Sequence, residues 1–596
     1  MENIAIQQRL KGLRDLMQHS GIDAYIIPSN DPHISEYPAE HWKCREWISG
    51  FSGSAGTVIV TESKAGLWTD SRYFLQAEAQ LDGTGIDLYR QGLPGTMDML
   101  TFLLSEVKER GTVGFDGQVY SVSDAEMLGR HLERKQITMK TDRDLVGELW
   151  NARPAIPENP VFLLPEEFAG KSVEDKLIAV NNELHRQGAD CTILAALDEI
   201  AWLFNLRGTD VEYNPVAITY AFVSEEETVL FVNPKKLSEE VVTRLKQEGV
   251  LFADYNHVNI YLGKLSSGKR VLVDPKRVNI ALFNALPSDV RIVEGVSPIP
   301  LMKGVKNETE LKGFRNAVVK DGVALVRFLK WLEEEMQAGH AVTEMSASAK
   351  LTSLRSEQPL YVMDSFATIC GYASHGAIVH YEATPETDAE LKPESLLLID
   401  SGAQYFDGTT DITRTIALGT PTEAMMKDYT KVLKGTISLA KCKFPVGTRG
   451  SQLDILARKA LWDSGLNYLH GTGHGIGHCL NVHEGPQSIR MEENPVALQP
   501  GMVISDEPGL YRAGEYGIRI ENMILVRSEG CTEFGEFLSF ETLTLCPIDT
   551  RPIIVPMLSV RERIWLNKYH QEVYEKLSPY LTESEREWLK VKTEEI

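Results

Sequence analysis

Helical hydrophobic patterns alternate with short apolar runs along the first 300 residues. Ile4, Leu10 and Met17 recur with the period of an amphipathic helix. This predicted helix stops at Gly21, and the strand-like run AYIIP follows it. A second helical pattern ends at Gly188 and also leads into an apolar run, CTILAAL. Both segments therefore predict α/β structure.

The two segments also resemble each other position by position. In SGIDAYIIPSNDPHI and in QGADCTILAALDEI, a glycine is followed two residues later by an aspartate and then by a strand-like run. This similarity predicts a duplicated α/β domain. The paired positions are Gly21 with Gly188, Asp23 with Asp190, Asp31 with Asp198, and the runs TVIV from Thr57 and TVLF from Thr228.

Changes in composition divide the chain into three predicted domains. The segment 151–165 contains four prolines and is typical of a linker. Near residue 305 a long amphipathic helix begins, with Asn307 or Thr309 as its N-cap. Helices then alternate with strand-like runs such as LLLID, DITRTIA and IRIENMILV, and the charged tail from Ser559 is helical. The predicted domains are residues 1–152, 153–305 and 306–596.

Composition and charge exclude several classes of protein. The net charge of −23 excludes a nucleic-acid partner, because phosphate binding requires clustered Lys and Arg. The sequence contains neither a run of about 20 apolar residues nor a secretory signal, so we expect no membrane association. The seven cysteines are scattered and form no CxxC motif, which is typical of free thiols in a reducing compartment. These features predict a cytoplasmic protein.

Histidines gather in one part of the chain. Six of the fourteen lie between residues 375 and 483, and three of them form the run HGTGHGIGH at 470–478. Its histidines have helical spacing, but the four interleaved glycines disfavour a helix. We expect these glycines to let the backbone approach a bound group closely. The run is not the HExxH motif of zinc peptidases, and no GK[ST] follows that would indicate a phosphate loop.

Acidic residues occupy positions that a fold would prefer to make apolar. Asp400 ends the buried-looking strand LLLID, and Asp411 opens DITRTIA. Glu507 precedes a proline, which favours an extended backbone, and Glu521 lies in IRIEN on the face opposite the isoleucines. A buried carboxylate requires a cation or a proton.

Metal ions explain this group better than salt bridges do. Taken one at a time, each acid is most simply a helix cap or a member of a salt bridge. However, only Arg414 and Arg519 are close in sequence to the four acids, and the glycine-flanked His474 lies between them. Four carboxylates and one imidazole form an oxygen-rich ligand set that suits manganese, with cobalt or zinc as substitutes. Two divalent ions would balance four negative charges, and a shared hydroxide between them would act as a nucleophile for hydrolysis.

At these residues the chain resembles a known family. The runs GAIVHY, DSGAQYFDGTTDITRT, HGTGHGIGHCLNVHEGP, SDEPG and GIRIEN resemble the aminopeptidase P family (Xaa-Pro aminopeptidases), in its long three-domain cytosolic form. The resemblance extends over nearly the whole chain. It implies two related creatinase-like α/β domains followed by a catalytic domain with the pita-bread fold. It also implies two metal ions, usually manganese, a homodimer, and release of an N-terminal residue from peptides with proline in the second position.

The resemblance implies a role for each matching residue. His380, His483 and Glu507 correspond to catalytic groups that contact the scissile peptide or transfer protons. His470 and Arg519 correspond to residues beside the substrate pocket. His375 and His478 match no assigned role and are interpreted as hydrogen-bonded loop histidines. The implied metal ligands are Asp400 on one metal, His474 and Glu507 on the other, and Asp411 and Glu521 bridging both.

Three alternatives are compatible with parts of this pattern. Prolidase uses the same ligand set on Xaa-Pro dipeptides, but the chain length and the duplicated N-terminal segment favour an enzyme acting on longer peptides. Methionine aminopeptidases usually lack two preceding α/β domains. A binding protein could keep the fold without catalysis, although the complete set of five metal-binding residues opposes that hypothesis.

Overall fold

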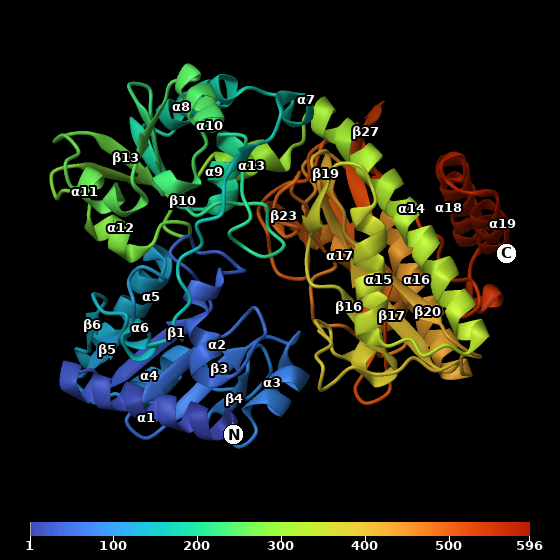
Figure 1. Cartoon of the computed structure of the whole chain (residues 1–596), viewed down its shortest axis with the longest axis horizontal. Helices are drawn as coiled ribbons and strands as arrows, with labels where there is room; N and C mark the ends of the chain where they lie inside the picture. The colour runs from blue at the N-terminus through green and yellow to red at the C-terminus, as the bar shows by residue number, and fades with distance from the viewer. Residues whose placement is uncertain (1) are drawn as a thin grey trace. The chain divides into compact units, whose positions relative to one another are not determined.

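The computed structural model describes residues 2–596, which form two compact units. The first unit contains the residues up to Leu164 together with Lys171–Glu212 and Val216–Ile299. The second contains Pro165–Gly170, Tyr213–Pro215 and Pro300–Ile596. In Figure 1 the first unit is coloured mainly from blue to green, and the second mainly from yellow-green to red. The three-domain boundaries given above stay predictions.

Two six-stranded sheets form the centre of the first unit, and both have the same topology. The strand order is β4-β3-β2-β1-β5-β6 in one and β12-β11-β10-β8-β13-β14 in the other. In each sheet the central strand pairs antiparallel with one of its two neighbours, β1 with β2 in the first sheet and β8 with β10 in the second. This repeat confirms the predicted duplication. The strands are β1 (Ala24–Pro28), β2 (Thr57–Thr61), β3 (Ala65–Thr69), β4 (Asp87–Arg90), β5 (Thr112–Gly114), β6 (Thr138–Lys140), β8 (Cys191–Leu194), β10 (Thr219–Ser224), β11 (Thr228–Val232), β12 (Val250–Ala253), β13 (Arg270–Val273) and β14 (Arg291–Glu294).

Equivalent helices lead into the two central strands. Helix α1 (Glu2–Ser20) precedes β1, and α8 (Val173–Arg186) precedes β8. The glycine after each helix has a left-handed backbone, with φ of 63° at Gly21 and 78° at Gly188, which a residue with a side chain rarely adopts. The predicted helix ends are therefore confirmed. Ile4 is an exception to the predicted pattern, because its side chain is 61% exposed on the outer face of α1.

The aspartates that follow these glycines make the same hydrogen bond in both halves. The carboxylate of Asp23 accepts a hydrogen bond of 2.8 Å from the backbone N–H of Thr112, at the start of β5. Asp190 accepts an equivalent bond of 2.9 Å from the N–H of Arg270, at the start of β13. Each aspartate thus joins the central strand to its parallel neighbour. This shared contact explains why glycine and aspartate recur at the same spacing.

One part of the sequence comparison was wrong by one strand. The runs TVIV and TVLF form β2 and β11, but the sheet order pairs β2 with β10 and β3 with β11 as counterparts. Both strands are buried and rich in β-branched residues, so their sequences resemble each other for reasons of burial alone. Short apolar runs therefore cannot fix the register of a distant repeat.

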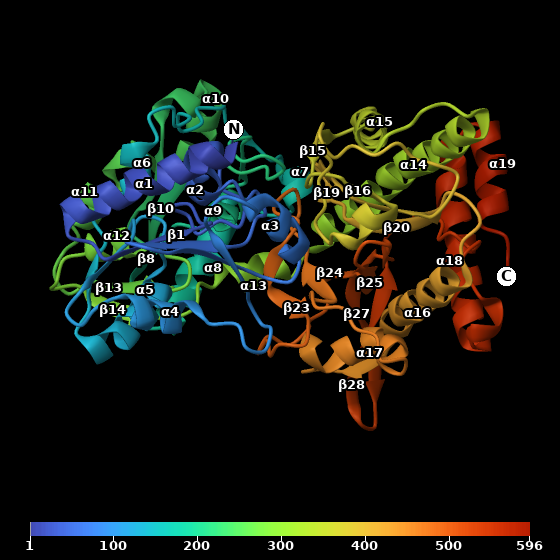
Figure 2. The same cartoon turned by 90° about the horizontal axis from the view of Figure 1, so that it is seen from below.

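The second unit consists of antiparallel strands between two pairs of helices. Figure 2 shows the strands between α14 with α15 on one side and α16 with α17 on the other. The strand pairs described within this unit are all antiparallel, as the predicted fold requires. Asn307 caps α14 and forms a capping box with Glu310, so the first of the two predicted N-caps is correct. The helices are α14 (Glu308–Ala338), α15 (Glu344–Ser356), α16 (Glu423–Ala440) and α17 (Gly450–Trp462).

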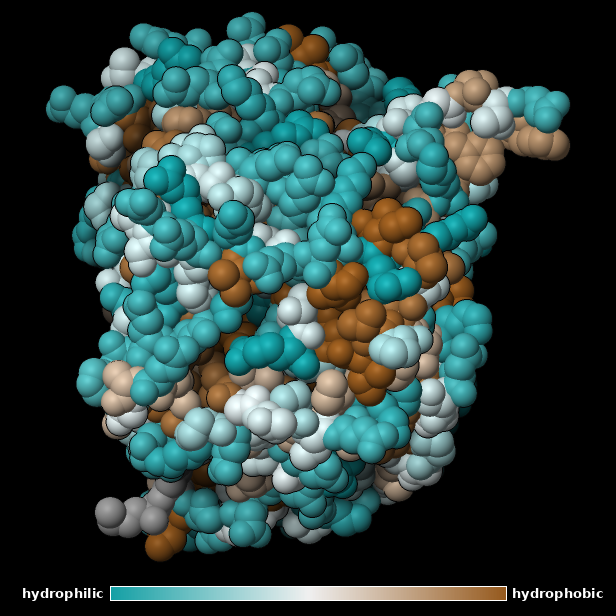
Figure 3. Space-filling model, turned by 90° about the vertical axis from the view of Figure 1, so that its right-hand side faces the viewer, coloured by the Kyte–Doolittle hydropathy of each residue, from teal (hydrophilic) through white to brown (hydrophobic). Residues whose placement is uncertain are grey.

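Two further helices complete the second unit at the C-terminal end of the chain. Helices α18 (Val560–Leu577) and α19 (Glu583–Lys592) pack against α14, and α18 also packs against α16. Figure 3 views the molecule from this side and shows hydrophobic side chains gathered among hydrophilic ones. Val560 and Ile564 on α18 are each 61% exposed. Among residues 2–596, no helix has the length and hydrophobicity needed to cross a bilayer.

Candidate active site

Two neighbouring strands carry the first pair of acidic residues. Strand β17 (Leu396–Ser401) pairs with β20 (Ile412–Ala417), and Asp400 lies opposite Thr413. Asp411 directly precedes β20. Side chains alternate along a strand, so Asp411 and Thr413 share one face of β20 while Arg414 points to the other. The fold thus brings Asp400 and Asp411 to the same end of one strand pair.

Part of the glycine-rich run forms a short strand inside a sheet and not a helix, as its glycines predicted. Strand β22 (Gly473–Gly475) pairs with both β23 (Glu484–Ile489) and β24 (Val503–Asp506). A Cβ atom on Gly473 would lie 1.9 Å from the carbonyl oxygen of Ser505, and one on Gly475 would lie 2.3 Å from that of Glu484. These glycines therefore permit close contact with neighbouring backbone. That the run also approaches a bound group closely stays a prediction.

Backbone hydrogen bonds place Glu507 beside this strand and Glu521 beside β20. The N–H of Glu507 donates to the carbonyl of Thr472 at a distance between N and O of 2.8 Å. The N–H of Glu521 donates to the carbonyl of Thr413 at 3.1 Å. Glu507 follows β24 directly, and Glu521 lies between β26 (Tyr516–Arg519) and β27 (Asn522–Thr532).

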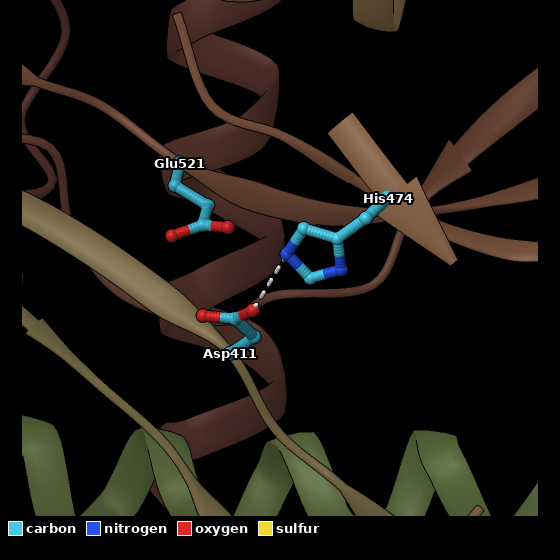
Figure 4. A group of neighbouring side chains, drawn as sticks. All are labelled: Asp411, His474 and Glu521. Carbon is cyan, nitrogen blue, oxygen red and sulfur yellow. Dashed lines mark ion pairs between the residues drawn. The ribbon is translucent and has the colours of Figure 1, made fainter. Parts of the chain in front are cut away.

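Three of the predicted residues converge within a few ångströms. Asp411, His474 and Glu521 each offer a ligand atom, and these atoms lie within 4.8 Å of one another. Figure 4 shows the three side chains pointing toward a common centre. The Nε2 atom of His474 lies 3.4 Å from Oδ2 of Asp411 and 3.5 Å from Oε1 of Glu507. The fourth acid, Asp400, joins the group through Arg519.

The hydrogen-bond partners indicate that a cation belongs at this centre. Nδ1 of His474 lies 3.0 Å from the carbonyl oxygen of Gly475 and must carry a proton to bond it. Nε2 of a neutral ring then directs its lone pair at carboxylates, which can only accept. In addition, Oδ1 of Asp400 is buried and has no hydrogen-bond partner among the described residues. Buried acceptors that face one another require a proton or a metal ion.

The pKa values of these side chains also reflect the crowding of buried acceptors. Burial lowers the pKa of His474, but the hydrogen bond to Asp411 and the charge of Glu507 outweigh it and raise the pKa to about 9. Burial raises the pKa of Glu507 to about 7, and the nearby charges of Asp411 and Asp400 add to this effect. Burial, followed by the charge of Asp411, raises the pKa of Glu521 well above its ordinary value. Without metal, the group therefore retains protons at neutral pH.

Arg519 connects Asp400 to Tyr511, a residue of the site that the sequence did not indicate. Its Nη2 atom lies 2.6 Å from Oδ2 of Asp400, and its Nη1 atom donates to the hydroxyl of Tyr511 at 2.7 Å. The same hydroxyl lies 2.8 Å from Nε2 of His470. Tyr511 thus connects two predicted substrate-binding residues, His470 and Arg519. Its position depends on the hairpin of β25 (Gly509–Arg512) with β26, and no motif in the sequence indicates it.

Two hydroxyl groups that sequence reasoning missed orient the glutamates. The hydroxyl of Thr413 donates to Oε2 of Glu521 at 2.8 Å. The hydroxyl of Ser505 donates to Oε1 of Glu507 at 3.1 Å and accepts the backbone N–H of His474 at 3.0 Å. Alternation along DITRT was a signal for Thr413, because it shares the face of Asp411. Nothing in the sequence marked Ser505.

The remaining histidines fall into two groups. The ring of His483 lies 4.4 Å from that of His474 at an angle of 71°, and His380 follows Val379, whose carbonyl lies 3.4 Å from Nη2 of Arg519. His483 therefore borders the group, and the backbone beside His380 contacts Arg519. By contrast, Nδ1 of His375 bonds the carboxylate of Glu344 at 2.9 Å, as expected of a structural histidine. His478 is buried, and its ring packs edge-on against Phe314.

Comparisons with known proteins agree with this architecture. Two family models described as Creatinase/Prolidase N-terminal domain match the chain, one at residues 9–142 and the other at residues 152–310. Metallopeptidase family M24 matches residues 312–528, and the C-terminal region of peptidase M24 matches residues 536–596. The two creatinase-type matches coincide with the duplicated sheets. The M24 match contains every acidic residue and histidine of the site.

Relatives match the chain over almost its full length. A probable Xaa-Pro aminopeptidase P of Coprinopsis cinerea is 41% identical over 99% of this chain and 98% of its own. Xaa-Pro aminopeptidase 1 of Dictyostelium discoideum is 40% identical over 99% and 96%. A crystal structure of an X-prolyl aminopeptidase from Caenorhabditis elegans, described as a cytosolic enzyme with a di-nuclear active site, superposes with a TM-score of 0.95. It is 34% identical and covers 99% of this chain and 100% of its own.

The fold, the acidic group and the family matches together define a metallopeptidase of family M24. The imidazole and carboxylates lie on strands of the M24 region, and two creatinase-type domains precede them. Within that class, the full-length similarity is decisive. The chain belongs to the Xaa-Pro aminopeptidase P family.

Proposed function

We propose that the chain removes the N-terminal residue from peptides that carry proline in the second position. The convergence of Asp411, His474 and Glu521 carries this proposal, because a metallopeptidase requires such a group and the family relatives bear this activity in their names. The two creatinase-type domains before the M24 region favour longer peptides over dipeptides. A prolidase activity, restricted to Xaa-Pro dipeptides, is the second hypothesis.

The residues present fit two divalent ions. Asp400 would hold one ion, His474 and Glu507 the other, and Asp411 and Glu521 would contact both. The set contains four carboxylates and one imidazole, so we propose manganese, with cobalt or zinc as substitutes. The buried and unpartnered Oδ1 of Asp400 supports this fit. When bound, the two ions would activate a water molecule and polarise the scissile carbonyl.

The surrounding side chains would manage protons and hold the peptide. We assign His380 and His483 to hydrogen bonds with the scissile peptide group, where a charge develops on the carbonyl oxygen. Glu507 would accept a proton from water and pass it toward the departing proline nitrogen, which must be protonated to leave. Arg519 and His470, joined by Tyr511, would form the wall of the substrate site.

A peptide assay separates the two hypotheses. We expect the purified protein to cleave a tripeptide of the Xaa-Pro-Xaa type, because the proposed carboxylates and histidines act on the peptide bond before proline. Chelator should abolish cleavage and manganese should restore it, with two equivalents of metal measured by mass spectrometry. An Xaa-Ala-Xaa tripeptide is the matched substrate control. Cleavage confined to Xaa-Pro dipeptides would establish prolidase, and cleavage that survives complete metal removal would contradict the proposal.

Replacement of His483 tests its proposed hydrogen bond to the scissile peptide group. We expect His483→Gln to lower kcat by about 100-fold or more while the metal content is unchanged, since one donor to the developing charge contributes about that much. His375→Gln is the matched control, because His375 bonds Glu344 outside the acidic group. A kcat for His483→Gln equal to that of the control variant would remove His483 from the mechanism.

Assembly and location are also proposals. We propose a cytoplasmic homodimer, which the family resemblance supports. Two large apolar side chains on one face of α17 are exposed, at 40% for Ile455 and 41% for Trp462, and suit a contact between copies. Light scattering after size exclusion would give the mass in solution. A monomer at micromolar concentration would contradict the dimer, and fractionation of source cells would test the location.

A further inference from the structure

Arg414 lies behind the metal-binding group, on the opposite face of strand β20. The sequence DITRT places Asp411 and Thr413 on one face, so the side chain of Arg414 projects from the other. Its exposed fraction is only 4%, and its interactions differ from those of a surface arginine. Nothing in the mechanism above uses this residue.

Arg414 and its neighbour hold Glu521 from two sides. Nη1 of Arg414 donates to the backbone carbonyl of Glu521 at 2.6 Å. The hydroxyl of Thr413 donates to the carboxylate of the same residue at 2.8 Å, and the carbonyl of Thr413 accepts its N–H at 3.1 Å. Both ends of Glu521 are thus fixed by consecutive residues of β20. A shift of Arg414 would move the backbone from which the Glu521 carboxylate extends.

The other side of the guanidinium reaches the C-terminal part of the chain. Its Nη2 atom donates to the hydroxyl of Tyr569 on α18 at 2.8 Å and to the carbonyl of Cys546 at 2.9 Å. The Tyr569 hydroxyl in turn lies 2.8 Å from the same Cys546 carbonyl, to which it can donate. Nε of Arg414 donates to the carbonyl of Pro547 at 3.2 Å. The guanidinium therefore joins β20 and Glu521 to helix α18 and to the segment that precedes it.

The positively charged guanidinium of Arg414 also lies near the acidic group. Within residues 2–596 its hydrogen bonds end on neutral acceptors, namely backbone carbonyls, the Asn522 amide oxygen and the Tyr569 hydroxyl. A buried cation that bonds no carboxylate is costly unless an anion lies near. Burial lowers the pKa of Arg414, but its neighbours outweigh burial and raise the pKa, Tyr569 most and Glu521 to a smaller extent. Glu521 is the carboxylate among these neighbours.

We propose that Arg414 and Tyr569 are positioning residues through which helix α18 fixes Glu521 in the geometry that metal binding requires. The inference rests on the proposed role of Glu521 as a metal ligand. It gives the C-terminal region, residues 536–596, a function in the metal centre although no residue of that region contacts the acidic group directly in the hydrogen bonds described. Groups behind a metal ligand commonly set metal affinity in this way.

The substitution Tyr569→Phe tests the inference with little disturbance of packing. It removes one hydroxyl that accepts from Arg414, while the ring remains. Tyr429→Phe is the matched control, since Tyr429 is also buried and its hydroxyl donates to a backbone carbonyl of the same C-terminal segment, that of Asp549, at 2.9 Å. Tyr429 makes no hydrogen bond with Arg414 in the described structure. Tyr569→Phe removes the acceptor for Arg414 and the donor to the Cys546 carbonyl, whereas Tyr429→Phe removes one donor. Manganese affinity is therefore measured well below both thermal midpoints, where both variants are folded and a general loss of stability does not alter it.

We expect Tyr569→Phe to weaken manganese binding about tenfold in calorimetric titration, and to lower kcat with KM unchanged. Tyr429→Phe should lower the thermal midpoint less than Tyr569→Phe does, and should bind manganese like the wild type. Arg414→Lys, which cannot supply the same set of donors, should weaken binding further. Equal manganese affinities for the two tyrosine variants would overturn the inference. If the wild type itself bound fewer than two ions, the proposed function would fail instead, so the two failures are distinguishable.

Discussion

Asp411→Asn is expected to lower kcat at least about 1,000-fold and to reduce the bound metal below two equivalents. The substitution keeps the shape of the side chain but removes its negative charge. Asp411 lies within 3.4 Å of His474 and within the same group as Glu521, so no neighbouring carboxylate can replace it. A loss of this size corresponds to about 4 kcal/mol of transition-state stabilisation. Steady-state kinetics and metal analysis on the same preparation measure both effects.

The control for this variant is another buried aspartate. Asp407 is 4% exposed and forms an ion pair with Lys320, outside the acidic group. We expect Asp407→Asn to lower the thermal midpoint, because it leaves a buried ammonium group without its partner, but to keep two metal ions. Two equivalents of metal and a near-normal kcat in Asp411→Asn would remove this residue from the predicted ligand set.

The second large effect is a pH-dependent difference between the metal-free and the manganese-loaded protein. In the metal-free protein the pKa of His474 is raised to about 9 and that of Glu507 to about 7. For each group the folded state binds its proton more tightly than the unfolded state does. The stability they contribute is complete below the unfolded pKa values and is lost as pH rises through the folded ones. Metal-free protein should therefore lose stability between about pH 4.5 and 9.

Bound metal should remove this dependence, because it replaces the protons on both groups. We expect the gap between the thermal midpoints of the two forms to widen from pH 6 to pH 8.5. The free-energy difference that accumulates should be on the order of 3 kcal/mol, since one pKa unit corresponds to about 1.4 kcal/mol. Scanning calorimetry at a fixed excess of free manganese, with chelator in the paired sample, measures the gap. Parallel pH profiles for the two forms would contradict the expectation.

Much of the architecture could be predicted because it depends on local pattern. The helix ending at Gly21, the strand AYIIP and the cap at Asn307 follow from periodicity and from the backbone preferences of glycine and asparagine, and the structure confirms them. The duplicated domain was also predicted correctly, since the glycine and aspartate in each half make the same contacts. The register of the repeat was not, because buried strands resemble one another whatever their place in the sheet.

The chemistry of the site could also be predicted only in part. Residue type and position indicated which acids and histidines matter, because a carboxylate at the end of an apolar strand is costly without a partner. Their arrangement was beyond the sequence, as Asp411 and Glu521 are more than 100 positions apart and meet only through strand pairing. The glycines of β22 show the limit clearly. Only the sheet shows which protein atoms approach them, namely the carbonyl oxygens of Ser505 and Glu484.

The sequence by itself therefore determined the family, the order of the domains and the residue types available for metal chemistry. Those properties reside in local runs and their spacing, which survive in a single chain without coordinates. Only the tertiary structure decided which acceptors face one another around His474, that Tyr511 joins His470 to Arg519, and that Arg414 connects Glu521 to helix α18. Apart from the contact of Tyr511 with Arg519, these contacts link residues 41 to 155 positions apart. Hydrogen bonds and charges act over a few ångströms, so their partners are fixed by the packing of strands and helices and not by distance along the chain.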